Sequence, residues 1–531
     1  MIISLLLSSV LGYLVWTVVC LEANVRKARA LQVPVVRIPF SAESNTLVIF
    51  QPVVWAALSR CLPSIPWSSY PDFVRFSHRN WHFLEKSRPT ERFGPVWVLV
   101  SPAGISLHVA DPDAIVEIYS RWRAFVRPVQ KYVGMGWNSA PNPGDAARLG
   151  YQTPSKITSL EGDLRALTFN VLSATAFQEP RDLKSGSPHA AEHELAATAS
   201  YRDTLLVVLE SSILLMLIPY RHLTGALVPK SLARVGRAAA SFKSILMKVV
   251  TEETAVLDRD SSTSGGLLTP LVRSLKPLLA AANEDVASRA KRGGLSADEI
   301  LGNTFAINFA GHDTILIALS FALTLLVANP DIQEWLHEES VAVAEDGDDG
   351  WHYSAFAKLN RCHAVILETL RLFAPITGLP KIASERAREL QVGDRVIPVP
   401  PGIGVFPVLL GIQTDARYWG TDPYQWRPSR WILNPGTTTG DERLLVPRKG
   451  TFFPWSDGPQ NCVGKKLSMV EGVAVLARLF HRHRLRVERG VGETDAQARE
   501  RTRDCADDVN YNLLLRMNHP ERLRLVCEKR E

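Results

Sequence analysis

The chain has 531 residues, of which 46% are hydrophobic and 21% charged, and its formal net charge is +6. This length allows one large domain or two to three smaller ones. The basic residues are scattered, which excludes an arginine-rich nucleic-acid-binding tract but leaves open a basic docking face for an acidic partner. The six cysteines lie far apart without a CxxC pair, which argues against a disulfide framework and a structural zinc site and favours a reducing compartment.

The N-terminus begins with an uncharged apolar segment. Ile2 to Leu21 is about long enough to cross a bilayer as a helix. Arg26, Lys27 and Arg29 follow it, which favours a cytoplasmic location for the rest of the chain. A cleaved signal peptide is the alternative, but the segment has no basic n-region and no clear small-residue cleavage site. The sequence therefore predicts an anchor helix.

The expected domain boundaries follow from this segment. We expect a transmembrane anchor over residues 1–22, a linker over residues 23–70 and one main domain over residues 71–531. Within the linker, Thr46 to Ser59 is apolar but short, and Pro52 interrupts it. We expect this segment to lie in the membrane interface or to pack on the main domain.

The main domain opens with a predicted β-hairpin. Residues 92–112 alternate and are rich in β-branched side chains, with a turn near Pro102 to Gly104. A helix is expected over Asp111 to Arg123, where the ADPDAI sequence supplies a capping signal. Residues 134–160 are predicted to be irregular, and helical periodicity resumes at Gly162.

The best-defined element is a long apolar helix over residues 296–329, which ends before a proline. At 1.5 Å per residue it is roughly 50 Å long. A helix that is apolar nearly all round must run through the middle of a large domain or through a membrane. Asn303, Asn308, His312 and Asp313 would be unfavourable against lipid, so we place the helix in the centre of the domain.

The remaining elements are mostly short. Ala357 to Pro375 is predicted to be a helix, and Glu389 to Gly402 forms two extended segments that turn at Gly393-Asp394. A helix over Gly464 to His481 and a β tail near Tyr511 to Leu525 follow. The predicted fold class is mainly α with small β-sheets (α+β).

Cys462 stands between two glycines in the stretch FFPWSDGPQNCVGKK, just ahead of a predicted helix. A thiolate is stabilised by backbone N–H groups, by the positive end of a helix or by a metal, and Gly464 lets the backbone approach closely. Gly458 shapes the preceding turn. A nucleophile and a small core residue are the alternatives, and an isolated cysteine is most often the latter. The surrounding pattern favours a sulfur that faces a large planar group.

Two further groups of residues are candidates for a functional role. Glu368 and Arg371 lie three apart on a largely apolar helix, so the pair is expected to be buried and to need another partner, for which Arg430 in WRPSRW is the candidate. The AGHDT sequence, Ala310 to Thr314, lies in the middle of the long helix. Small residues beside an acid and a hydroxyl make room for a ligand and supply proton donors. The alternative is a local helix distortion, with Asp313 satisfied by a neighbour.

In this order, the motifs resemble those of the haem-thiolate monooxygenases, the cytochrome P-450 superfamily. The resemblance runs from about Arg92 to the C-terminus. Its core is a long helix with A/G-G-x-D/E-T, then E-x-x-R, then an aromatic-x-P-x-R-aromatic stretch, then the cysteine loop. The N-terminal anchor, the PWSDG sequence and the lysine pair after Cys462 are similar to the microsomal, fungal branch. The resemblance implies the fold of that family, with the long helix over a haem.

The resemblance also implies roles for individual residues. Cys462 would be the axial thiolate ligand of the iron in haem b. The other residues expected at the cofactor are Gly458, Gln460, Gly464, Trp455, Ala310 and Gly311, the last two leaving space for dioxygen. Glu368, Arg371 and Arg430 would form a structural triad that holds the cysteine loop. Asp313 and Thr314 would relay protons. Ile376, Thr377 and Leu379, within ITGLPK (Ile376 to Lys381), would line the substrate cavity.

The implied function is hydroxylation or oxidation of an apolar small molecule in secondary metabolism, with O2 and an NADPH-dependent flavoprotein reductase as partners. Lys465 and Lys466 would help to dock the acidic reductase. The expected location is the endoplasmic reticulum membrane, with a single anchor, a cytosolic monomeric domain and no nucleic-acid partner. A transporter that uses residues 300–328 as a span is an alternative from another class, but the rest of the chain lacks further spans.

The sequence departs from the family pattern in two places. Trp455 replaces the first phenylalanine of the cysteine loop, and Gln460 replaces its basic residue. Tryptophan could give the sulfur an indole N–H, and glutamine can bond a haem propionate without neutralising it, so we expect altered redox tuning or weaker haem retention. The propionate-binding helix is also expected to be missing between Asn142 and Gly162, because Arg165 fits the following helix. The alternative function is therefore a non-catalytic or haem-deficient member of the same fold.

Overall fold

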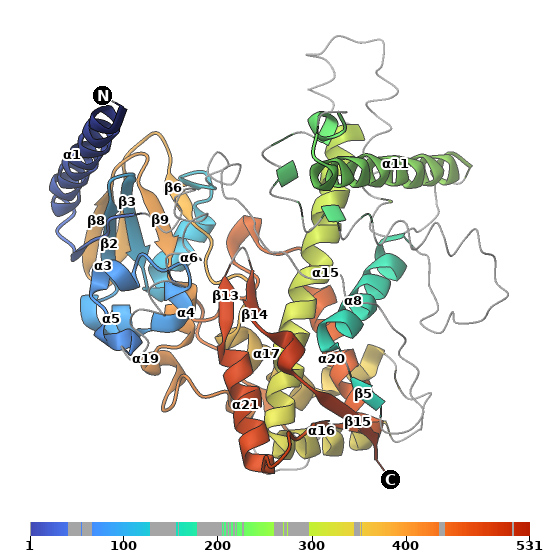
Figure 1. Ribbon diagram of the computed structural model, residues 1–531. Helices are drawn as coiled ribbons and strands as arrows, with labels where there is room; N and C mark the ends of the chain where they lie inside the picture. Colours follow the sequence, from blue (N-terminus) through green and yellow to red (C-terminus); the bar gives the residue numbers. More distant parts are fainter. Residues whose placement is uncertain are drawn as a thin grey trace. The chain divides into compact units, whose positions relative to one another are not determined.

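The structure is a computed structural model (Figure 1). It describes residues 2–40, 66–127, 155–157, 159–177, 220–225, 228–259, 297–344, 353–434, 441–511 and 514–530, together with Trp55, Trp351 and isolated positions between 204 and 273. The chain divides into two compact units. Unit 1 comprises residues 1–136, 331–481 and 503–518, and unit 2 comprises residues 137–330, 482–502 and 519–531.

Unit 1 contains a six-stranded sheet in the order β1-β2-β3-β9-β6-β4. Its strands are β1 (Val35–Arg37), β2 (Val96–Ser101), β3 (Gly104–Val109), β4 (Phe125–Val126), β6 (Lys381–Ala383) and β9 (Gly404–Pro407). β2 and β3 form the predicted hairpin, with Val98 opposite Leu107. β1 is parallel to β2 and β9 is parallel to β3, whereas β6 is antiparallel to both β9 and β4. The predicted hairpin is confirmed.

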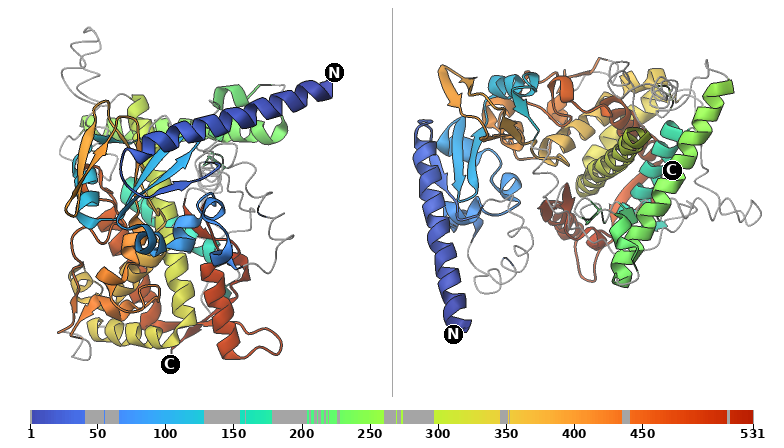
Figure 2. Two further views of the ribbon diagram at one scale, coloured as in Figure 1. Left: turned by 90° about the vertical axis from the view of Figure 1, so that its left-hand side faces the viewer. Right: turned by 90° about the horizontal axis from the view of Figure 1, so that it is seen from above.

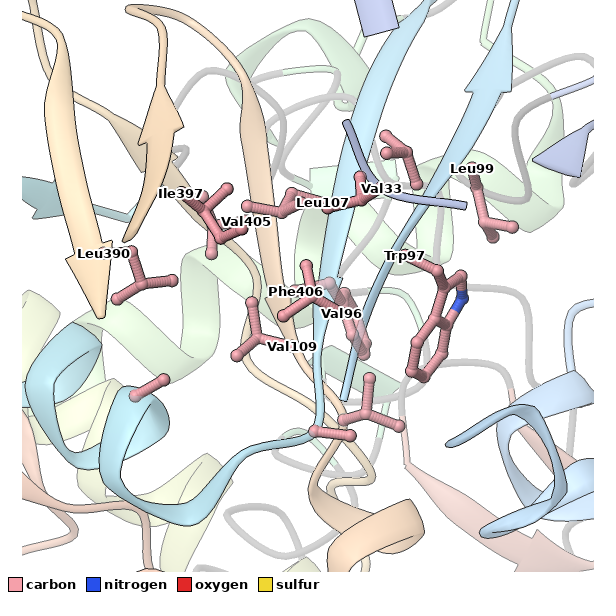
Figure 3. Packing of buried hydrophobic residues seen from close by; sticks show 14 of the residues in the cluster. Val33, Val96, Trp97, Leu99, Leu107, Val109, Leu390, Ile397, Val405 and Phe406 are labelled. Atoms are coloured by element: carbon pink, nitrogen blue, oxygen red, sulfur yellow. The ribbon is translucent and has the colours of Figure 1, made fainter. Parts of the chain in front are cut away.

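The core of unit 1 lies around this sheet. β2 is buried along its whole length, which suits its continuous apolar sequence. Leu107, Val109 and Val405 from the sheet pack in one cluster with Leu390 and Ile397 from a separate hairpin (Figure 3). That hairpin is formed by β7 (Arg388–Val392) and β8 (Arg395–Val399) around Gly393, at the predicted turn.

Unit 1 also contains most of the short helices. They are α3 (Asp72–Arg75), α4 (Trp81–Glu85), α5 (Arg88–Phe93), α6 (Pro112–Ser120), α16 (Pro330–Val343), α17 (Asn360–Leu372), α18 (Leu409–Gln413), α19 (Ala416–Trp419) and α20 (Lys465–Arg482). α6 begins as predicted, because the Asp111 carboxylate accepts a hydrogen bond of 2.9 Å from the Ala114 N–H. The short sheets β10–β11 (Ile432–Leu433, Arg443–Leu444) and β13–β14 (Val509–Tyr511, Leu515–Met517) complete the unit.

The first helix, α1 (Ile2–Arg29), ends inside the core of unit 1. Val25 and Ala28 are buried there, and β1 adds residues 35–37 to the sheet. Part of the expected linker, residues 23–70, is therefore folded into the core. The expected interfacial segment, residues 46–59, lies outside the described residues except for Trp55.

Unit 2 is built on long helices and a small sheet. Its helices are α8 (Leu160–Phe177), α11 (Lys230–Arg259) and α15 (Ala297–Ala328), and α21 (Asp495–Asp507) begins in it. Its sheet has the order β12-β15-β5, with strands His483–Val487, Leu525–Lys529 and Ser155–Ile157. The predicted long helix is confirmed as α15. Most of the region where a helix was expected to be missing lies outside the described residues.

Among the described residues, one helical stretch is long and apolar enough to cross a membrane, and it is Ala310–Ala328 in α15. The structure buries 83% of it, which fits a core helix. The predicted fold class, mainly helical with small β-sheets, is confirmed.

Candidate active site

In unit 1, α17 and the short turn η5 (Pro428–Trp431) bring together the three residues of the expected triad. Glu368 is fully buried and accepts hydrogen bonds from Arg371 Nε at 2.8 Å and from Arg430 Nε at 2.8 Å. The Trp431 indole donates to the same carboxylate at 2.9 Å. Burial alone would raise the pKa of Glu368, but the bonds and charges of the two arginines outweigh it and hold that pKa below its ordinary value.

Gln413 links this triad to the cysteine loop, and the sequence analysis missed it. Its amide N–H donates to the Arg371 carbonyl at 3.0 Å, and its Oε1 accepts from the Phe453 N–H at 2.9 Å. The guanidinium of Arg371 donates in turn to the Gln413 carbonyl at 2.8 Å. Gln413 is 1% exposed, so both of its polar ends depend on these partners. Its position at the end of α18 gave no local signal of this role.

The cysteine loop is shaped by Gly458. Its φ is +70°, and a Cβ at this position would lie 2.5 Å from the Tyr119 carbonyl oxygen, so both the backbone conformation and the close approach require glycine. The Cys462 N–H donates to the Trp455 carbonyl at 2.8 Å, which closes the loop. A Cβ at Gly464 would lie 3.7 Å from the Cys462 sulfur, an ordinary separation. Among the described cysteines, Cys462 is the exposed one.

The Trp455 indole does not serve the sulfur in the way we considered from the sequence. Its N–H donates to the Ser468 hydroxyl at 3.0 Å, and the Lys465 ammonium lies 5.4 Å from its ring centroid. Both partners belong to α20, which starts just after the loop. Trp455 therefore fastens the loop to the first turn of α20.

Gln460 lies beside two cations. Its side-chain oxygen accepts a hydrogen bond of 3.0 Å from Lys381 Nζ, and its carbonyl accepts one of 2.9 Å from Arg127. Lys381 is 2% exposed and begins β6, which pairs with β4 immediately before Arg127. Burial, together with the charge of Arg127, lowers the pKa of Lys381 to about 8. The basic charge missing from the loop at Gln460 is thus supplied by Lys381 in β6 and by Arg127, which directly follows β4.

The residues expected to line the substrate cavity lie between α17 and β6. Ile376 is 36% exposed and Thr377 is buried, while Leu379 packs partly against the core cluster of unit 1. Gly378 leaves room for the ring of Phe406. Lys381 ends the same stretch but points to the cysteine loop through its bond to Gln460.

In unit 2, the AGHDT sequence presents its residues to different sides of α15. Gly311 faces α8, where a Cβ would lie 3.3 Å from Leu172 Cδ1, so the glycine permits close helix packing. Asp313 is buried, and its Oδ1 lies 3.7 Å from a guanidinium nitrogen of Arg165 on α8. The Thr314 hydroxyl instead donates to the Ala310 carbonyl at 2.8 Å on its own helix.

Arg165 is a second residue that the sequence analysis left without a role. Besides its ion pair with Asp313, it donates a hydrogen bond of 2.7 Å to the Glu161 carboxylate one turn earlier on α8. The structure thus places a cation from another helix at ion-pair distance from Asp313. The cysteine loop belongs to unit 1 and the AGHDT sequence to unit 2.

The glycine-shaped loop with its exposed cysteine and the buried glutamate with two arginines are the features that the sequence analysis linked to the haem-thiolate monooxygenases. The cytochrome P450 family model matches residues 152–502. The chain belongs to the cytochrome P450 family, and it is an oxidoreductase of the monooxygenase type.

Three relatives illustrate the similarity. A cytochrome P450 monooxygenase of Arthrobotrys oligospora is 25% identical, with 96% of this chain and 95% of the relative covered. One from Penicillium roqueforti is 24% identical, with 86% of each chain covered. The phomenoic acid biosynthesis cluster cytochrome P450 monooxygenase of Leptosphaeria maculans is 30% identical, with 56% of this chain and 53% of the relative covered.

The residues of unit 1 fit the haem that the family implies. The exposed sulfur of Cys462 is the soft donor that haem iron accepts in this class. Lys381 and Arg127 are cations beside the same loop, and cations of this kind bind carboxylate groups such as the two propionates of a haem. The fit therefore extends to the position where the loop lacks its own basic residue.

Proposed function

We propose that the chain is a membrane-anchored haem-thiolate monooxygenase that hydroxylates or oxidises an apolar small molecule. The observation that carries this proposal is the exposed thiol of Cys462 on a loop tied through Gln413 to the buried Glu368 group. The reaction uses O2 and two electrons from an NADPH-dependent flavoprotein reductase. One oxygen atom enters the product, and the other leaves as water with two protons.

The residues of each unit have distinct tasks in this proposal. In unit 1, Cys462 would bind the iron, and Lys381 with Arg127 would hold the propionates. Bound haem supplies the activation of O2 and the transfer of one oxygen atom. The Asp313 carboxylate would accept a proton and return it by way of the Thr314 hydroxyl. Arg165 orients Asp313 through their ion pair.

The proposed substrate class rests on the chain's own residues and on its relatives. Ile376 and Leu379 offer apolar contacts beside α17, and Thr377 offers one hydroxyl. The name of the Leptosphaeria maculans relative connects that protein to phomenoic acid biosynthesis, which supports a role in secondary metabolism. We propose the endoplasmic reticulum membrane as the location, with the N-terminal part of α1 as the anchor and a monomeric catalytic domain over residues 71–531, to which the end of α1 and β1 add.

The reduced carbon-monoxide difference spectrum of the expressed full chain tests the proposed chemistry. We expect the red-shifted Soret band of a thiolate-ligated haem, and Cys462→Ala should abolish it. Cys505→Ala is the matched control, because this cysteine is buried in α21, and it should retain the band. A folded preparation without haem absorbance would contradict the proposal and support the haem-deficient alternative.

A further inference from the structure

Three aromatic rings that the proposed function does not use meet at one place in unit 1. They belong to Trp55, Trp67 and Tyr70, and all three residues are partly exposed. The ring centroids of Trp55 and Trp67 lie 6.0 Å apart. The Tyr70 centroid lies 6.2 Å from that of Trp67 and 6.3 Å from that of Trp55. The three centroids therefore form a nearly equilateral triangle that reaches the surface of the protein.

The planes of these rings face in different directions. The angle between the planes is 45° for Trp55 and Trp67, and the Tyr70 plane makes angles of 82° with Trp55 and 54° with Trp67. Such rings do not stack, and together they form a corner with three walls. Because the three separations are nearly equal, one point can lie about 4.5 Å from every centroid, inside the roughly 6 Å over which a cation is attracted to a ring face.

Buried polar partners fix one wall of this aromatic corner. Trp67 lies on the short turn η1 (Trp67–Ser69), and its indole N–H donates to the Glu85 carboxylate at the end of α4 at 2.5 Å. Glu85 is 1% exposed and also accepts a hydrogen bond of 2.8 Å from Arg75 Nε on α3. In turn, α3, in the blue part of the chain in Figure 2, packs against β1 of the sheet. The corner is therefore tied to the core of unit 1 before any ligand arrives, which lowers the cost of binding.

His78 supports two of the walls without adding a charge. Its ring meets Trp55 edge to face at a centroid distance of 4.5 Å and Trp67 at 5.3 Å. Its Nδ1 accepts a hydrogen bond of 3.0 Å from the Asn80 N–H. Burial lowers the pKa of His78 from 6.5 to about 4, so this imidazole is neutral at physiological pH. It therefore does not repel a cation at the rings.

Two arginines in the same part of the chain are paired with acids. The Arg75 guanidinium is bonded to Glu85, and Arg92 lies 2.6 Å from Asp72. Neither guanidinium thus brings an unbalanced positive charge to the aromatic corner. The negative ring faces are the groups that remain to attract a ligand, and they attract cations.

We propose that Trp55, Trp67 and Tyr70 bind a quaternary ammonium group. This inference goes beyond the proposed function and does not depend on it. A quaternary ammonium has no N–H to donate and surrounds its charge with methyl groups, so it suits walls made of ring faces. A free choline-type metabolite and the choline headgroup of a phospholipid share this chemistry.

The first test is a calorimetric titration of the full, haem-loaded chain in dodecyl maltoside, a detergent without an ammonium group. The ligands are choline and its neutral carbon isostere, 3,3-dimethyl-1-butanol. Both have the same shape, so we expect choline to bind about fivefold or more tightly because only choline carries the charge. Equal affinities would contradict the proposal, since they would show a merely apolar surface.

The second test keeps the shape of the corner and changes only the ring electrostatics. Trp67 is replaced by tryptophan analogues with one, two and three ring fluorines, which weaken the negative ring face and retain the N–H that Glu85 accepts. We expect the choline affinity to fall stepwise with each fluorine. The same analogues at Trp122, which is 37% exposed and lies 5.0 Å from Arg123, are the control and should leave the affinity unchanged. A choline affinity that ignores fluorination at Trp67 would overturn the cage.

A third titration identifies the source of the group. Dihexanoylphosphatidylcholine is used below the concentration at which it forms micelles. Tighter binding of this lipid than of choline would support the cage with a phospholipid headgroup as its occupant, and weaker binding would support the cage with a free quaternary ammonium compound. Binding of neither ligand, in a chain that is folded by circular dichroism, would show that the three rings form no such site.

Discussion

Lys381 and Gln460 are hydrogen-bonded to each other, and each explains why the other is tolerated at its position. A glutamine in the cysteine loop removes a charge, and a buried lysine at the start of a strand is unfavourable on its own. The 3.0 Å hydrogen bond between them places the positive charge of Lys381 beside Gln460. The pair therefore offers a carboxylate both a cation and an amide N–H.

Replacing Lys381 should weaken haem binding. Lys381→Met removes the buried cation but keeps an apolar stem of similar length, so we expect the haem affinity of the haem-free chain to fall by about tenfold or more. Lys381→Arg keeps the charge, so the haem affinity of this variant should fall much less. Titration with haemin, followed by absorbance, measures both. An unchanged affinity in Lys381→Met, in a chain that is folded by circular dichroism, would show that Lys381 does not hold the cofactor.

These two residues also show where sequence reasoning stops. The loss of charge at Gln460 was visible from the loop motif, but Lys381 is 79 residues away and was assigned to the substrate cavity. No local pattern connects a strand residue to a loop residue at that separation. The triad was easier, because Glu368 and Arg371 lie on one helical turn and need a buried partner. Gln413 had no such signal.

At the scale of elements, α8 and α15 are joined by an ion pair between Arg165 and Asp313. The pair lies where α15 is otherwise apolar, and Asp313 is 6% exposed. A buried carboxylate needs a partner of opposite charge or a proton. The ionised carboxylate of Asp313 therefore depends on a residue of a different helix.

A double-mutant cycle should reveal this dependence. Arg165→Met leaves the Asp313 carboxylate without its ion pair, and we expect the free energy of unfolding to fall by about 1–3 kcal/mol. Asp313→Asn in the Arg165→Met background should restore part of the loss, because the charge is gone. Urea unfolding of the four chains measures the coupling. Strictly additive effects would mean that the two side chains do not interact.

Element types and boundaries could be predicted well where the signals are local. The cap at Asp111, the turn at Gly393 and the apolar run of α15 each lie within one element, and the structure agrees with all three. The strand order β1-β2-β3-β9-β6-β4 could not be predicted, since β4 and β6 pair Phe125 with Ala383 across a long separation. Such pairings depend on packing that only the folded chain provides.

At the scale of the whole molecule, acid stability should depend on two imidazoles in unit 1, of which His108 is buried and His82 is partly buried. His108 is 3% exposed, and its ring stacks with Trp97 at a centroid distance of 5.7 Å. His82 stacks with Phe406 at 4.4 Å. Burial lowers the pKa of His108 from 6.5 to about 3 and the pKa of His82 well below its ordinary value. Both rings are therefore neutral in the folded chain.

The sign of the effect follows from proton uptake. Between pH 6.5 and 3 the unfolded chain binds a proton on His108 and the folded chain does not, so stability is lost as the pH falls through this window. His108 contributes about 1.4 kcal/mol per pH unit there. His108→Phe should make the pH dependence of unfolding shallower by that slope, as measured by chemical denaturation at several pH values. An unchanged slope would mean that His108 is protonated in the fold.

The small sheet of unit 2 determines when the unit can fold relative to the synthesis of the chain. Its central strand, β15, ends at Lys529 and pairs with β5, whose residues 155–157 leave the ribosome far earlier. Unit 1 likewise draws on residues 1–136, 331–481 and 503–518. Neither unit can complete its fold during translation, because the ribosome has not yet synthesised its last strands or helices. The N-terminal helix is complete long before that moment. The nascent chain must therefore stay unaggregated for almost the whole of its synthesis, and truncation of the last few residues should harm folding as much as a deletion in the core.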